Sequence, residues 1–144
     1  MFNRIRSFHN STTLLVDYLQ SPALLAARVY VAWVFFKSGL TKLNDWDSTL
    51  MLFEYEYEVP FLDHMTAAYL ATGGELLLPV LFALGLLSRF SAAGLFIINW
   101  VAVISLVDMP QAAFNLHLIW AGLTGLVFAW GGGFLSVDKK LKLN

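Results

Sequence analysis

The chain has 144 residues, of which 58% are hydrophobic and 13% are charged. Soluble domains contain about 45–50% apolar and about 25% charged residues, so this composition disfavours a soluble domain and excludes a disordered chain. The absence of cysteine excludes disulfides, thiolate metal sites and a cysteine nucleophile, and a net charge of −1 leaves no basic face for nucleic acid.

The first segment, residues 1–21, is polar. Asp17 interrupts its one short apolar run, so it lacks the apolar core of a secretory signal peptide. We expect a cytoplasmic N-terminal segment. Residues 11–19 would form either a short helix on the inner membrane surface or a plain polar tail.

Four apolar segments follow, at about residues 22–43, 65–88, 90–107 and 111–135. Each is close to the roughly 20 residues that a membrane-spanning helix needs. The third, FSAAGLFIINWVAVISLV, carries no charge and has none of the polar face that a helix in a soluble bundle requires. The sequence therefore predicts an all-α integral membrane four-helix bundle, one domain over residues 22–138, followed by a basic cytoplasmic tail at 139–144.

The charges outside these segments predict the orientation, because positive charge collects on cytoplasmic loops. The basic residues that set it are Arg4, Arg6, Arg89, Lys139, Lys140 and Lys142. The other two loops are acidic or neutral. We expect both termini to be cytoplasmic and the long first loop to be extracytoplasmic, with Lys42 as the exception at the outer end of the first helix.

The long first loop contains Phe53–Val59, in which apolar and acidic residues alternate. This period of two predicts an extended segment. The acidic and histidine side chains around it are Glu54, Glu56, Glu58, Asp63 and His64. Their spacing matches no metal motif, and they form either a solvated face or a surface for a hard metal ion or copper.

Ionisable residues inside the apolar segments are candidates for a functional site, because a charge at membrane depth is costly. Lys37 and Glu75 lean toward each other from antiparallel helices, and we prefer this pair; Arg28–Glu75 is the rival. Arg28 alone could also extend toward the inner headgroups. The pair either fixes helix packing only, or makes Glu75 an acceptor for a proton or a ligand.

His117 lies about 9 Å below the outer end of the fourth helix, at the depth of Lys37 and Glu75, and Asn99 lies at mid-depth on the third. His117 is either a hydrogen-bonded packing residue or part of the site. These side chains could frame a polar pocket that opens outward, in which Glu75 and His117 are the catalytic candidates.

Three stretches resemble the DoxX family of small four-helix membrane proteins: RVYVAWVFFKSGLTKL, GGELLLPVLFALGLLSR and GGGFLSVD. The residues that carry the resemblance are Arg28, Gly39, Lys42, Glu75, Pro79, Gly85, Arg89 and Asp138. Arg28, Gly39 and Lys42 lie within about 40° of one helical face, and the resemblance puts that face inside the bundle. Ser38 stands where many members have a histidine, so no role of that histidine carries over.

The resemblance implies a protein of the bacterial inner membrane with a role in redox or metal-stress physiology, and the sequence looks like the subgroup beside bufferin-type metal-handling systems. We expect an accessory subunit that binds a membrane or periplasmic partner protein or a second copy, together with a quinone or another small hydrophobic ligand. The alternatives are a membrane subunit of a quinone-linked oxidoreductase and a transporter or metal-handling component.

Overall fold

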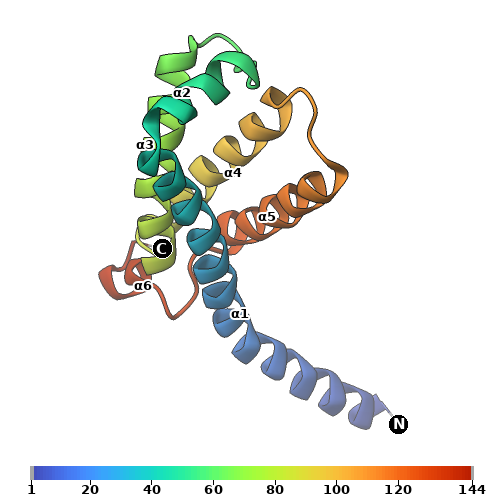
Figure 1. Cartoon of the computed structure of the whole chain (residues 1–144). Coiled ribbons are helices and arrows are strands. Elements are labelled where there is room, and N and C mark those ends of the chain that lie inside the picture. Colours follow the sequence, from blue (N-terminus) through green and yellow to red (C-terminus); the bar gives the residue numbers. More distant parts are fainter. Residues whose placement is uncertain (1, 144) are drawn as a thin grey trace.

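The chain is all-helical in the computed structural model, which describes the backbone of residues 2–143 and the side chains of residues 19–143. The helices are α1 (Phe2–Asn44), α2 (Trp46–Tyr55), α3 (His64–Leu84), α4 (Ser88–Ser105), α5 (Gln111–Trp130) and α6 (Val137–Leu141) (Figure 1). Across residues 2–143 there is no strand, and one isolated antiparallel bridge joins Tyr57 to Leu106. The predicted all-α class is confirmed.

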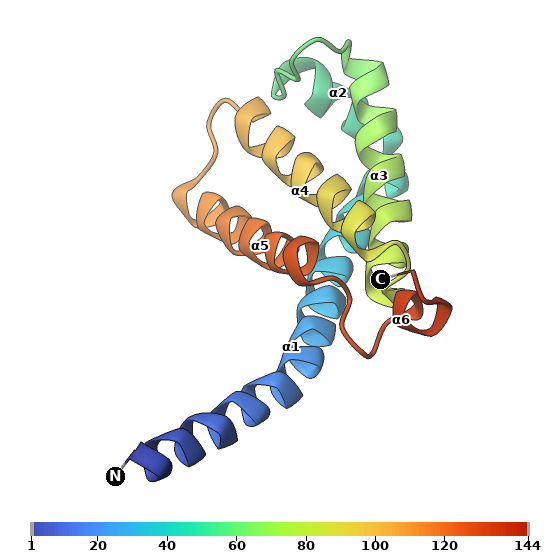
Figure 2. The same ribbon diagram turned by 180° about the vertical axis from the view of Figure 1, so that it is seen from behind.

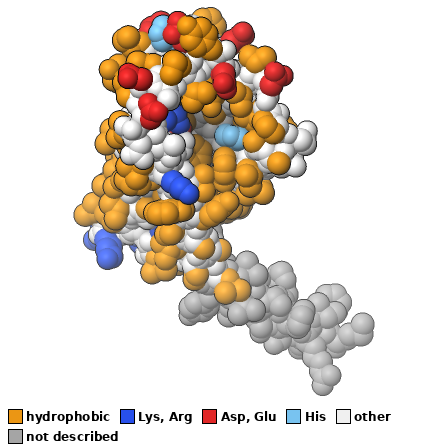
Figure 3. Space-filling view, viewed as in Figure 1, with side chains coloured by type: hydrophobic (Ala, Val, Ile, Leu, Met, Phe, Trp, Pro, Cys, Tyr) orange, Lys and Arg blue, Asp and Glu red, His pale blue; other side chains and the backbone are white. Residues whose placement is uncertain are grey.

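Four of these helices are long and apolar enough to cross a membrane: Leu19–Asn44 within α1, then α3, α4 and α5. Their outward faces carry large exposed apolar side chains, among them Trp33, Leu77 and Ile97. Apolar side chains cover much of the face shown in Figure 3 below the α2 helix. Such faces suit contact with lipid, and the predicted four-helix membrane bundle is confirmed.

The first helix begins earlier than the apolar segment. We expected a helix from about residue 22, whereas α1 is continuous from Phe2 and contains Pro22. Proline removes one backbone donor but does not always end a helix. The expectation of an interfacial helix or polar tail over residues 11–19 concerns side chains that, up to residue 18, lie outside those described.

The long first loop is more helical than expected. Its first half forms α2, whose N-terminus is capped by Asp45, which accepts a hydrogen bond from the Ser48 N–H at 3.0 Å. Phe53 packs on Ala67 and Ala68 of α3. The predicted extended segment over Phe53–Val59 is therefore wrong up to Tyr55, because helix packing buries Phe53 more fully than an isolated strand could.

The chain after α2 crosses back over the end of α4. Glu58 N–H donates to the Ser105 carbonyl at 2.8 Å, beside the Tyr57–Leu106 bridge. We call residues 57–62 the strap. Opposite it, at the other end of the bundle, α6 and the connection before it pack beneath α3 and α4 (Figures 1 and 2). These two ends are called the α2 end and the α6 end below.

The core lies where α1, α3, α4 and α5 meet. Its buried apolar side chains are Leu24, Val31, Ala32, Phe35, Phe82, Ala92, Leu95 and Val127. Gly39 brings α1 and α3 close together, because a Cβ at this position would stand 3.2 Å from the backbone carbon of Glu75 and 2.9 Å from the Leu76 side chain. This close approach holds the upper part of α1 against Glu75.

Candidate functional site

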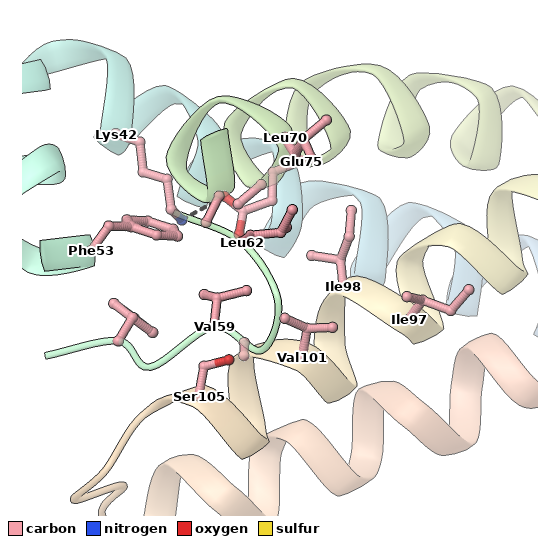
Figure 4. Close-up of a pocket in the computed structure, with 14 residues that line it drawn as sticks. Lys42, Phe53, Val59, Leu62, Leu70, Glu75, Ile97, Ile98, Val101 and Ser105 are labelled. Atoms are coloured by element: carbon pink, nitrogen blue, oxygen red, sulfur yellow. Dashed lines mark hydrogen bonds and ion pairs between the residues drawn. The ribbon is translucent and has the colours of Figure 1, made fainter. Parts of the chain in front are cut away.

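A lysine and a glutamate form an ion pair inside the upper half of the bundle (Figure 4). Lys42 Nζ stands 2.6 Å from Glu75 Oε2, with side-chain exposures of 19% and 10%. Lys42 also donates to Ser38 Oγ at 3.0 Å. Among the described side chains this is the one ion pair within 4.0 Å, and the two charges stabilise each other where water is scarce.

The expected partners of Glu75 are wrong. Lys37, our preferred partner, is exposed on the outside of α1, because five residues rotate it by about 140° from Lys42. Arg28, the rival, is fully buried far below, at the α6 end. Lys42 reaches Glu75 because a helical side chain leans toward the N-terminus of its own helix, which carries its ammonium down into the bundle.

Two cavities meet at this ion pair. One, of ≈ 180 Å³, is lined mainly by apolar side chains of α2, α3, α4 and the strap, including Phe53, Val59 and Leu70. The other, of ≈ 230 Å³, lies between α1, α4 and α5. Lys42, Glu75 and Tyr57 line both cavities. The charged pair therefore stands at the boundary between an apolar lobe and a more polar one.

Tyr57 adds a hydroxyl to the same place. Its ring stacks on Phe53 with centroids 4.9 Å apart. Burial, followed by the negative charges of Glu75 and Glu56, raises the pKa of Tyr57 above its ordinary value of 10.0. The phenol is therefore protonated at neutral pH and can donate a hydrogen bond to a ligand.

His117 and Asn99 hold each other at the edge of the second cavity. The Asn99 amide donates to the His117 carbonyl at 3.0 Å, and His117 Nδ1 lies 2.8 Å from Asn99 Oδ1. The His117 carbonyl can only accept, so the Asn99 atom that faces it must be the amide nitrogen. The Asn99 atom that faces the ring is then Oδ1, which is an acceptor, and His117 Nδ1 therefore carries the proton. Its Nε2 is then an acceptor.

This arrangement unites some of the expected residues and separates others. Glu75 and His117 both line the second cavity, with Asn99 behind His117. Lys37 and Arg28 are not part of it. From the sequence, Lys42 was identified as a family-motif residue and as the exception to the charge rule, Ser38 only as the residue in place of a family histidine, and Tyr57 was not identified as part of the site. Lys42 and Ser38 could have been found from helix geometry, because the Lys42 side chain leans toward the N-terminus of its helix and Ser38 lies one turn away in that direction.

Arg28 belongs to a separate buried cluster at the α6 end. Its guanidinium donates to the Ala83 carbonyl at 3.3 Å and to the Leu135 carbonyl at 2.5 Å. It thereby joins the end of α3 to the connection before α6. Two donors directed at two elements use the fork geometry of arginine, so Arg28 has a structural role here.

Asp138 completes this cluster. Its carboxylate accepts hydrogen bonds from the backbone N–H groups of Leu87 and Ser88, both at 2.7 Å, and so caps the start of α4. Burial alone would raise the pKa of Asp138, but the hydrogen bonds from Ser88 and Leu87 and the charge of Arg28 outweigh it and lower the pKa below 3.8. The carboxylate stays charged at neutral pH.

The acidic residues of the first loop do not converge. Among residues 19–143, whose side chains the structure describes, no three histidine, cysteine, aspartate or glutamate side chains are placed to hold a metal ion. Asp63 instead caps α3 by accepting from the Thr66 N–H at 3.0 Å, and the hydrogen bonds with Thr66 lower its pKa. Acidic side chains are spread over the α2 end (Figure 3), as expected for a solvated face.

The chain resembles known sequences over most of its length. The sequence model of the DoxX family matches residues 23–108, which include the ion pair and Arg28. An uncharacterised protein of Haemophilus influenzae is 33% identical over 129 residues, which cover 83% of this chain and 83% of the relative. No solved structure matches significantly. The resemblance seen in the motif residues is thus confirmed, and the chain belongs to the DoxX family.

Proposed function

We propose that this DoxX protein is a membrane subunit that binds a small amphipathic molecule of the quinone type beside Lys42 and Glu75. The observation that carries this proposal is the position of the ion pair at the meeting point of two cavities. A charged pair at membrane depth is costly unless it is used or neutralised. Here it is neutralised and also accessible to a ligand.

The side chains around the cavities match the oxygens of a quinone ring. Lys42 and Tyr57 can donate hydrogen bonds to a ring carbonyl, and the Glu75 carboxylate can accept a bond from a hydroxyl of the reduced form. Each cavity is smaller than the roughly 300–1,000 Å³ of a pocket for a drug-sized ligand. A single substituted ring fits this space better than a bulky polycyclic molecule.

A second candidate function is favoured by the presence of His117 on the same cavity as Glu75. Quinone reduction requires protons as well as electrons, and these two side chains can hold a proton near a bound ring. In this candidate the chain is the membrane subunit of a quinone-linked oxidoreductase, and a substrate or a partner protein supplies the electrons.

The setting proposed for this activity is the bacterial inner membrane, with the α6 end in the cytoplasm. The basic residues near that end and the bacterial source of the relative support it. A partner protein on the acidic α2 end, or a second copy of the chain, belongs to the same proposal.

The test is the binding of decylubiquinone to the full-length protein in lipid nanodiscs. Binding is measured by the quenching of tryptophan fluorescence. We expect saturable quenching. A Glu75→Gln variant should weaken binding by about tenfold, as the loss of one charge-assisted hydrogen bond predicts. Glu54→Gln changes an exposed glutamate of α2 outside both cavities and is the matched control. Absence of saturable binding, or equal binding by the Glu75 and Glu54 variants, would contradict the proposal.

A further inference from the structure

The two helices that border the second cavity, α1 and α5, touch at one level and separate above it. Trp120 of α5 donates to the Tyr30 hydroxyl of α1 at 3.4 Å, and its ring meets Phe35 edge-on with centroids 5.9 Å apart. From there the two helices diverge toward the α2 end, in both views of the ribbon (Figures 1 and 2).

The upper half of α5 is only partly covered by protein, with Ala113, Phe114 and His117 half-buried against the rest of the bundle. Its buried residues are Thr124 and Val127, both on the α6 side of Trp120. From Gln111 to Ile119 no residue of this helix is buried. Trp120 lies about 14 Å along α5 from Gln111, so the partly covered stretch of this helix is about that long.

The second cavity lies in this gap. Val34 and Ser38 line it from α1, Ala113 and His117 line it from α5, and the ion pair stands at its inner end. The surface is hollowed between α1 and α5 on the face shown in Figure 3, where a histidine side chain is visible. In a bilayer this gap faces acyl chains.

The first cavity is covered on the side toward the α2 end. The strap passes over the first cavity, which Tyr57, Val59 and Leu62 line. The backbone hydrogen bond from Glu58 to Ser105 and the Tyr57–Leu106 bridge fix the strap to the end of α4. A ligand that entered through the first cavity from the α2 end would have to displace these contacts, whereas one that came through the gap between α1 and α5 would not.

We propose that the ligand reaches the site sideways from the bilayer, between α1 and α5, and that it is a lipid-dissolved amphiphile with one apolar chain. Its head lies against Lys42 and Glu75, and its chain leaves through the gap past Ala113 into the surrounding lipid. This inference rests on the proposed function and adds to it the requirement for a chain and the route of access.

An exposed lysine lies beside this route. Lys37 is seven residues from Tyr30, nearly two helical turns, so it shares the stripe of α1 that borders α5. Its side chain is exposed, and none of the described carboxylates pairs with it. A cation there, with Lys42 farther in, favours a head rich in acceptor oxygens.

Two neighbouring alanines of α5 offer a matched pair of variants. Ala113 lines the second cavity, whereas Ala112 is exposed and lines none of the cavities described. The probes are decylubiquinone, which has an apolar chain, and ubiquinone-0, which has the same ring without one. Ala113→Phe should weaken decylubiquinone binding by about tenfold and ubiquinone-0 binding by much less, and Ala112→Phe should leave both at the wild-type level.

A second measurement does not depend on the folding of any variant. A ubiquinone analogue with a photoreactive diazirine at the end of its chain should label residues 30–38 or 109–120, which border the gap. Labelling of residues 56–62 instead would place the chain under the strap and overturn the lateral route, as would equal decylubiquinone affinities for the two alanine variants. If neither quinone binds the wild-type protein saturably, the proposed function itself fails.

Discussion

At the residue scale, the Lys42–Glu75 pair is expected to contribute to stability through mutual neutralisation. Removing one partner leaves the other charge buried and uncompensated, which typically costs about 3–5 kcal/mol. Lys42→Met and Glu75→Leu should each lower the free energy of unfolding, measured by titration of detergent micelles with a denaturing detergent. The double variant should recover much of the loss, because no lone charge is left.

Lys37→Met is the control for this pair, since Lys37 is exposed and has no described ion-pair partner. It should change the unfolding free energy far less than either single variant. If the double variant is no more stable than the less stable of the two single variants, the two charges do not stabilise each other.

Arg28 should be irreplaceable by lysine. Its guanidinium reaches carbonyls of two different elements, and a lysine ammonium lacks the flat fork needed for both. Arg28→Lys should therefore lower the melting temperature in detergent. Arg89→Lys, at an exposed arginine of α4, should have little effect. Equal melting temperatures of the two variants would contradict the bridging role of Arg28.

The lowered pKa of Asp138 predicts a pH dependence of stability. The pKa of Asp138 in the folded state lies below its ordinary value of 3.8. Such a carboxylate stabilises the fold fully at pH values above 3.8, and this contribution is lost as the pH falls through the pKa of the folded state. Asp138→Asn should thus be less stable than wild type at pH 7, and the difference should narrow toward pH 3. Thermal unfolding of both proteins at a series of pH values measures this difference in stability. A difference that stays constant with pH would contradict the lowered pKa of Asp138.

These residues also mark how far the sequence could predict the site. Membrane depth and charge singled out Glu75, His117 and Arg28, because an ionisable group in an apolar segment is visible without a structure. The choice among Lys37, Lys42 and Arg28 depended on how far α1 is rotated against α3. That rotation is fixed by the Gly39 contact, which no periodicity in the sequence specifies.

At the scale of the elements, the turn between α3 and α4 depends on Gly85. Its φ of +67° is left-handed, and a Cβ there would also collide with the Arg28 guanidinium. Gly85→Ala should reduce the free energy of unfolding by at least about 1–2 kcal/mol. Gly122→Ala lies on open helix surface and should be neutral or slightly stabilising. Equal unfolding free energies for the two variants would show that the turn tolerates a side chain.

The elements themselves were largely predictable, with one instructive error. Runs of about 20 apolar residues locate α3, α4 and α5 because a bilayer demands that length. In contrast, residues 53–59, of which the first three belong to α2, were expected to be extended, since Phe53, Tyr55 and Tyr57 alternate with glutamates. A helix forms up to Tyr55 because Asp45 caps its start and α3 buries Phe53, and both are contacts outside the alternating segment.

At the scale of the whole molecule, four membrane-crossing helices predict that Leu19 and Trp130 lie on the same side of the membrane. The charge distribution predicts that this side is the cytoplasm. A fluorescent protein fused after Asn144 should therefore fluoresce in a bacterial host. Alkaline phosphatase fused after residue 62 should be active, because it requires the oxidising exterior. The reverse pattern would show that the bundle is inserted upside down.

The Asp138 cap also bears on biogenesis. The carboxylate that completes the start of α4 is synthesised fifty residues after the Ser88 backbone it binds, so the α3–α4 hairpin is made before this cap exists. Chains generally fold from the N-terminus during translation, and here the last turn supplies the closing contact. A ribosome that stops at residue 135 should thus release a chain that membrane proteases recognise and remove, although all four crossings have been made.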